Sequence, residues 1–104
     1  MTSAGQTPAR RCEVTNAARL PAASGGSQVL CREIERAITA AAPTSSYTAR
    51  IVVLTASRLS AVLVVNDHAL PEQNFAVMDR ELDPSSIRRF AEALAGEVAK
   101  ATKE

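Results

Sequence analysis

The residues most suited to chemistry in this sequence are its two cysteines. Cys12 and Cys31 are separated by a polar stretch rich in Ala, Gly and Ser. The pair lacks the CxxC spacing of redox motifs and is two ligands short of a structural zinc site. One interpretation is a disulfide that ties an N-terminal arm to the first helix, a closure worth about 3 kcal/mol. The other is a pair of small buried thiols. We favour the disulfide, because the arm has few apolar residues to anchor it.

The N-terminal residues bear on the cellular compartment, because disulfides persist where conditions are oxidising. Residues 1–11 are polar and contain no apolar stretch typical of a signal peptide. Either the chain is cytoplasmic, or the sequence is a mature form whose signal has been removed. The cysteine pair favours the second interpretation, which is a periplasmic or secreted protein.

The single histidine, His68, follows Asp67 in a predicted turn. An Asp-His pair can support a general base or a metal ligand. Together with Glu72 and Asp79, the Asp67-His68 pair would form the binding site of a small-ligand-binding protein or a minor enzyme. This is the alternative to the interaction function that we favour below. Asn and Asp also favour turns for backbone reasons, and the nearby carboxylates lack the spacing of a calcium loop. We therefore assign no catalytic residue, no metal ligand and no cofactor.

The overall composition excludes several classes of protein. The chain has 104 residues, of which 46% are hydrophobic, and its formal net charge is +1. This size suits one domain, and the apolar fraction is too high for a disordered chain. No run approaches the ~20 apolar residues of a membrane span. A net charge near zero gives little electrostatic attraction for nucleic acid, and three aromatic residues give few surfaces on which bases could stack. The doublets Arg10-Arg11 and Arg88-Arg89 are typical of solvated surfaces.

Two segments have the apolar periodicity of amphipathic helices. Residues 27–41 place apolar side chains at every third or fourth position, and Ser27 is the expected N-cap. The second helix is expected to begin at Asp83-Pro84, because Asp is a good N-cap and proline suits the first helical position. Its apolar face includes Phe90, and basic residues lie near its end.

Three segments between the helices have the character of β-strands. Residues 47–56 and 59–66 are rich in β-branched side chains, and the short Ser57-Arg58 spacing predicts a hairpin. A shorter third strand is expected over residues 74–79. Antiparallel strands joined by short turns form a meander, and two helices can cover one of its faces.

These elements predict an α+β fold with two layers. The expected order is arm-α-β-β-β-α, with a three-stranded antiparallel meander under two amphipathic helices. Residues 1–26 are expected to be an irregular N-terminal arm, in which residues 11–14 can form a short extended piece, and residues 27–104 a single domain.

The first two predicted strands are apolar on both faces, whereas a sheet with one wet face should alternate with polar residues. The second face contains Val52, Leu54, Val62 and Val64, and full burial of each such side chain is worth about 1.5–3 kcal/mol. The N-terminal arm, one helix on each side of the sheet, or a second subunit could cover it. We therefore predict a non-catalytic protein-interaction or structural domain, exported to the cell envelope. Its partner would be another protein or a second copy of the chain, which would form a homodimer. The binding surface would be this apolar face, to which we also assign Met78, or an open strand edge.

Overall fold

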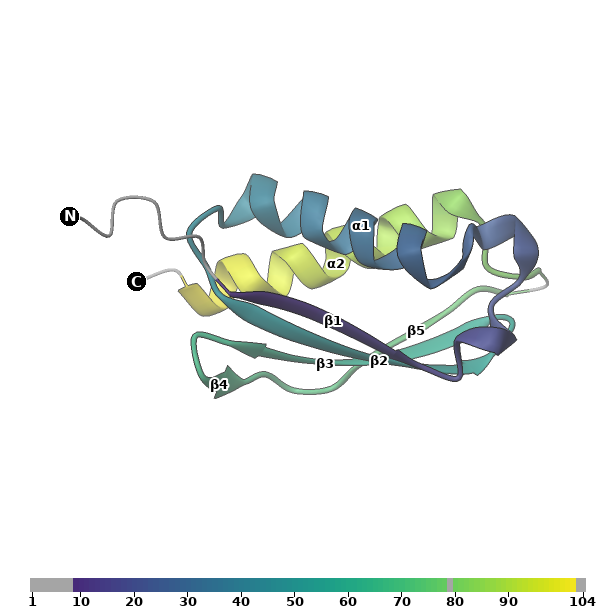
Figure 1. Cartoon of the computed structure of the whole chain (residues 1–104), viewed down its shortest axis with the longest axis horizontal. Helices are drawn as coiled ribbons and strands as arrows, with labels where there is room; N and C mark the ends of the chain where they lie inside the picture. The colour runs from purple at the N-terminus through teal and green to yellow at the C-terminus, as the bar shows by residue number, and fades with distance from the viewer. Residues whose placement is uncertain (1–8, 79, 103–104) are drawn as a thin grey trace.

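Two helices lie side by side on one face of a mixed β-sheet in the computed structural model, which describes residues 9–78 and 80–102 (Figure 1). The described elements, in chain order, are β1 (Arg10–Thr15), the short 3-10 helices η2 (Ala17–Arg19) and η3 (Ala22–Ser24), α1 (Gly26–Ala41), β2 (Tyr47–Thr55), β3 (Arg58–Val65), β4 (His68–Ala69), β5 (Gln73–Ala76) and α2 (Pro84–Thr102). The predicted α+β class and two-layer arrangement are confirmed.

The sheet differs from the predicted meander in its strand count and in one strand direction. Strands β2, β3 and β5 are the three expected strands, and they pair antiparallel in that order. The described residues add β4, a two-residue partner of β3, and β1, which pairs with β2 in parallel. The purely antiparallel, three-stranded prediction was therefore wrong. Parallel neighbours need a crossover connection, and η2, η3 and α1 provide it between β1 and β2.

Strand β1 lies inside the segment that the sequence indicated as an irregular arm. Its residues alternate between half-buried and exposed positions, and the half-buried ones are Arg10, Cys12 and Val14. Only one of these three side chains is a typical strand hydrophobe, so the apolar pattern is weak. The disulfide between Cys12 and Cys31 adds a covalent link between this edge strand and α1.

The turns follow the local sequence closely. Asn66 and Asp67, with φ of 50° and 70°, form the two-residue turn between β3 and β4, and these residue types tolerate positive φ. The β2–β3 hairpin turns at Ala56 and Ser57, one residue earlier than expected, because Arg58 already pairs with Thr55 across a register shift.

The residue before each long helix explains where that helix begins, a glycine for α1 and an aspartate for α2. Gly25 is the N-cap of α1, in place of the expected Ser27, and its φ of 91° suits glycine. A Cβ atom at Gly25 would lie 2.6 Å from Cγ2 of Val29, which is too close for a non-bonded contact, so a larger residue would clash there. Helix α2 begins at Pro84 as predicted, and the backbone N–H of Ser86 donates to Oδ1 of Asp83 at 2.8 Å.

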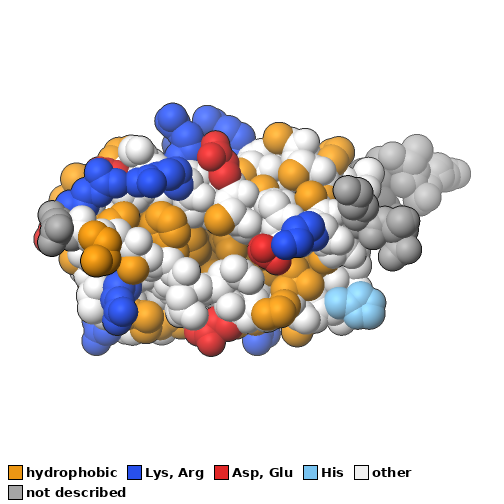
Figure 2. Space-filling model, turned by 180° about the vertical axis from the view of Figure 1, so that it is seen from behind, with side chains coloured by type: hydrophobic (Ala, Val, Ile, Leu, Met, Phe, Trp, Pro, Cys, Tyr) orange, Lys and Arg blue, Asp and Glu red, His pale blue; other side chains and the backbone are white. Residues whose placement is uncertain are grey.

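The hydrophobic core lies between the helical layer and the sheet. Both helices contribute fully buried side chains, and the rings of Phe75 on β5 and Phe90 on α2 have centroids 5.4 Å apart. From behind, apolar side chains reach the surface along the middle of the molecule, with charged side chains around them (Figure 2). Within the described part of the chain, neither helix is long and apolar enough to cross a bilayer.

The predicted disulfide is confirmed, because Cys12 of β1 is bonded to Cys31 of α1. The Cα atoms of the two residues are 5.8 Å apart, a spacing ordinary for this bond. The bridge fixes the outermost strand to the helix that covers it.

Candidate functional site

The face of the sheet that points away from the helices is the first candidate for function. Strand residues alternate between the two faces, and the odd-numbered residues of β2 and β3 are buried against the helices. The opposite side, called here the open face, consists of Thr48, Arg50, Val52 and Leu54 of β2, Ser60, Val62 and Val64 of β3, and Arg11, Glu13 and Thr15 of β1.

No described helix or strand covers this face, but the connection between β4 and β5 covers part of it, because Ser60 is only 6% exposed and its hydroxyl donates to Glu72. Both helices lie on the other side of the sheet (Figure 1), so the option of one helix on each side was wrong. The described part of the expected arm lies partly within the sheet as β1, and η2 contacts the end of β2, where Nη1 of Arg19 donates to the carbonyl of Leu54 at 3.1 Å. The Leu54 side chain remains 40% exposed.

The centre of the open face is apolar and its margins are charged. Val52, Val62 and Val64 are only half-buried, although they lie on the two central strands. On the β1 side, Nε of Arg50 lies 3.8 Å from Oε1 of Glu13. On the other side, the hydroxyl of Ser60 donates to the carboxylate of Glu72. The face therefore combines an apolar stripe with cations mainly on one side and a carboxylate on the other.

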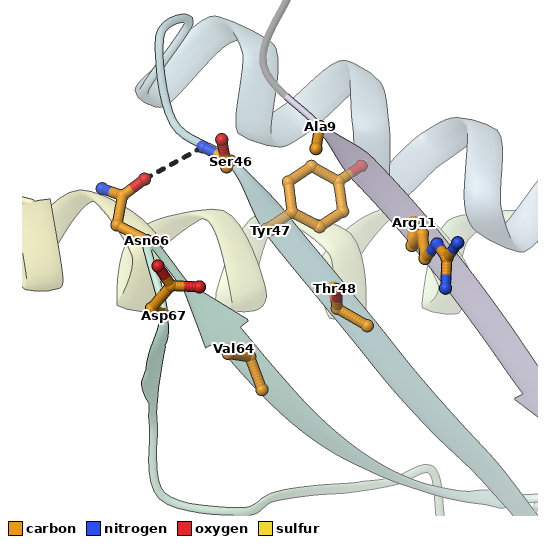
Figure 3. A pocket seen from close by; sticks show the side chains of 8 residues that line it. All are labelled: Ala9, Arg11, Ser46, Tyr47, Thr48, Val64, Asn66 and Asp67. Atoms are coloured by element: carbon orange, nitrogen blue, oxygen red, sulfur yellow. Dashed lines mark hydrogen bonds between the residues drawn. The ribbon is translucent and has the colours of Figure 1, made fainter.

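One end of the open face is hollowed, and Figure 3 shows it from outside the sheet, with the helices behind. The hollow has a volume of about 350 Å³. Thr48 and Val64 form its floor, and Arg11 and Asp67 bring opposite charges to its rim. Asn66 closes one side, because its Oδ1 accepts a hydrogen bond of 3.1 Å from the backbone N–H of Ser46.

The residues of the alternative ligand site are placed separately. Asp67 lines the hollow, whereas His68 is an exposed residue of β4 and does not line it. Glu72 is bound to Ser60, and Asp79 lies outside the described residues. Among the described residues, no group of three or more His, Cys, Asp and Glu side chains is arranged to hold a metal ion.

Met78 was predicted to belong to the same surface as the four apolar residues. The expected third strand ends earlier, at Ala76, so Met78 lies in the connection to α2. Its side chain is 82% exposed, the most of any large hydrophobic residue described.

A second candidate surface lies at the edge of the sheet, where β1 meets α1. A hollow of about 530 Å³ borders the disulfide there and is lined by side chains from both elements, including Arg10, Arg11, Gln28, Arg32 and Glu35. Three arginines and one carboxylate give this hollow a positive charge.

Arg10 is held firmly at this edge. Its Nη1 donates to the hydroxyl of Thr39 at 2.5 Å, and its Nη2 donates to the carbonyl of Pro43 at 2.7 Å. Its guanidinium also lies 4.0 Å from the Glu35 carboxylate and 5.9 Å from the centre of the Tyr47 ring. Arg10 therefore supports the wall of the hollow and has little freedom to bind a partner.

Tyr47 lies beneath both hollows. Burial raises the pKa of its phenol above the ordinary 10.0, and the Glu35 carboxylate raises the pKa further, while Arg10 opposes both effects. The phenol is therefore neutral at physiological pH and acts as a packing group with one polar end.

Sequence reasoning found a short extended piece over residues 11–14 but did not recognise it as an edge strand of the sheet. The Arg10-Arg11 doublet was interpreted as a solvated surface, which describes exposed Arg11 but not Arg10. The signal that could have found this edge is the alternation of Cys12 and Val14 with polar residues, which is typical of a half-buried strand. Comparisons with protein-family models, curated proteins and solved structures found no match for this chain.

Proposed function

We propose that this chain is a non-catalytic protein-interaction module whose open face binds a second copy of the chain. The observation that carries the proposal is the apolar stripe of Val52, Leu54, Val62 and Val64, which no described element covers. Contiguous apolar surface of this kind is typical of association sites. A sheet face can pack on its own copy with the strands about 30° apart.

The charges around the stripe favour a second copy as the occupant. Arg50 lies on one side of the stripe and Glu72 on the other. A two-fold axis that runs along the strands between β2 and β3 would place the Arg50 side of each copy against the Glu72 side of its partner. A net charge of +1 adds little long-range repulsion between copies.

The size of the face points to a reversible dimer. With about 4.8 Å between strands and about 3.3 Å per residue, four strands offer a patch of roughly 20 by 25 Å. Its flat area of about 500 Å² is smaller than the roughly 800 Å² per partner of a standard interface. We therefore expect dissociation in the micromolar range.

The disulfide supports an oxidising compartment, periplasmic or extracellular, as the place where the module works. Alkylation of the natively produced protein, followed by mass spectrometry, tests this part of the proposal. A mass without alkyl groups is expected, and two alkylated thiols would contradict it.

The open face is tested by Val62→Asp. The new carboxylate would lie in the middle of the stripe, next to Arg50 across the strand pair, so the monomer can accommodate it. Burying it in a dimer would cost several kcal/mol. Analytical ultracentrifugation is expected to show a dimer for the natural chain and a monomer for the variant.

The matched control is Ala93→Asp, which makes the same charge change on the exposed side of α2. It should leave the dimer intact. A natural chain that stays monomeric at high micromolar concentration would overturn the proposal, as would equal effects of the two substitutions. Urea unfolding of both variants shows whether the fold is retained.

A further inference from the structure

The outer edge of β1 is free among the described residues, because β2 is the only described strand that pairs with it. We propose that this edge binds, by strand addition, an extended carboxylate-rich segment of a protein partner. The edge is a different surface from the open face, so this inference is independent of the proposed dimer.

The backbone groups that would bind such a segment can be assigned from the register. The N–H of Tyr47 donates to the carbonyl of Ala9 at 2.9 Å, so Ala9 faces β2. Along a strand, successive residues direct their N–H and C=O groups to opposite edges. The backbone groups of Arg10, Cys12 and Val14 therefore face outward, and they are the ones that a partner strand would bind.

The side chains beside this edge are suited to carboxylates. A strand added to β1 would place alternate side chains on the two faces of the sheet. On the helix side they would meet the hollow of about 530 Å³ and Arg32 of α1. They would also meet Arg11, which lines both this hollow and the hollow on the open face. Neither arginine has an ion pair with a described residue, whereas Arg10 is engaged with Glu35.

Two other occupants fit this edge less well. Residues 1–8 of the chain contain no carboxylate, so they would leave the charges of Arg11 and Arg32 without partners. The β1 strand of a second copy carries two arginines and one glutamate, so it would add positive charge to a hollow that is already positive. A carboxylate-rich segment is the occupant that neutralises both arginines.

The direct test is a titration with a blocked acidic peptide, acetyl-EEVEEV-amide, followed by amide chemical shifts. We expect saturable shifts concentrated at Arg10, Cys12 and Val14. The matched peptide acetyl-KKVKKV-amide should produce none. Equal binding of the two peptides, or shifts concentrated at Val62 and Val64, would overturn the proposal.

The backbone part of the proposal is tested by Val14→Pro against Val14→Ala. Proline removes an N–H that faces outward and takes no part in the β1–β2 ladder, and an edge strand tolerates it there. Alanine truncates the side chain and keeps the N–H. We expect at least a tenfold loss of affinity for the acidic peptide with proline, and a loss of less than about threefold with alanine. Similar affinities for the two variants would overturn strand addition.

Two further measurements keep the test decisive if the proline variant does not fold. The acidic peptide N-methylated at every residue should not bind the natural chain, because neither of its edges then offers the N–H donors that strand addition needs. Arg11→Gln combined with Arg32→Gln should weaken the unmodified peptide about tenfold and reduce the salt dependence of its binding. Binding of the methylated peptide, or an unchanged affinity of the arginine variant, would contradict the proposal.

Discussion

Arg10 and Arg11 show how neighbouring residues of one type acquire different roles. The strand alternation turns Arg10 toward the helical layer, where carbonyl and hydroxyl oxygens satisfy its guanidinium. It turns Arg11 to the open face, where it is exposed. In the sequence the two arginines look identical. The side of the sheet to which each residue of β1 points makes Arg10 a structural residue and leaves Arg11 exposed.

Asp83 has a titration behaviour that follows from its position as the N-cap of α2. The backbone N–H of Ser86, and then the Ser86 hydroxyl, donate to its carboxylate and hold its pKa below the ordinary 3.8. A carboxyl group whose pKa is lower in the folded state stabilises the fold above its unfolded pKa. This stabilisation is lost as the pH falls through the folded value.

We therefore expect Asp83→Asn to be less stable than the natural chain at pH 6, with a difference that shrinks below about pH 4. The measurement is the urea unfolding midpoint at pH 6, 4, 3 and 2. Glu92→Gln, which removes an exposed carboxylate of the same helix, is the control and should show no such trend. A difference that stays constant down to pH 2 would contradict the role of the charge.

Among the elements, β1 depends most on a single covalent bond. It is the one described strand that reaches its neighbour through a crossover, and its sequence carries little apolar area. The Cys12–Cys31 bridge closes a separation of 19 residues, so in the chain-entropy description it restricts the unfolded chain.

We expect Cys12→Ser combined with Cys31→Ser to lower the free energy of unfolding by about 3 kcal/mol. The loss should be measured by urea unfolding, with amide exchange to locate it, and β1 should lose protection before β3. The natural chain with its disulfide reduced serves as the comparison and should resemble the variant. Unchanged exchange rates in β1 would show that pairing with β2 suffices without the bridge.

The elements were predicted with unequal success, for a physical reason. The helices and strands β2, β3 and β5 were predicted to within a few residues, because their periodicity and their turns are local properties. Strand β1 pairs with residues about 37 positions away, and no local pattern encodes such a partner. The N-cap of α1 was misplaced because Gly25 adopts a positive φ that a serine preference does not reveal.

For the whole molecule, the proposed dimer links stability to concentration. Association of folded chains shifts the unfolding equilibrium by mass action. The thermal midpoint should therefore rise by several degrees between about 5 and 500 µM for the natural chain. It should stay constant for Val62→Asp, and Ala93→Asp should follow the natural chain. A midpoint independent of concentration in all three proteins would contradict the dimer.

The sequence by itself determined that this chain forms two amphipathic helices and a β-branched hairpin, and that the hairpin carries apolar residues on both faces. These are consequences of side-chain type and spacing. The tertiary structure decided that both helices lie on the same face, which leaves the other one open (Figure 1). It also decided that the N-terminal segment extends the sheet as β1, whose outer edge is flanked by arginines and pairs with no other described strand. Both outcomes depend on contacts between distant residues, and the packing of layers and the pairing of strands establish such contacts only when the whole chain folds.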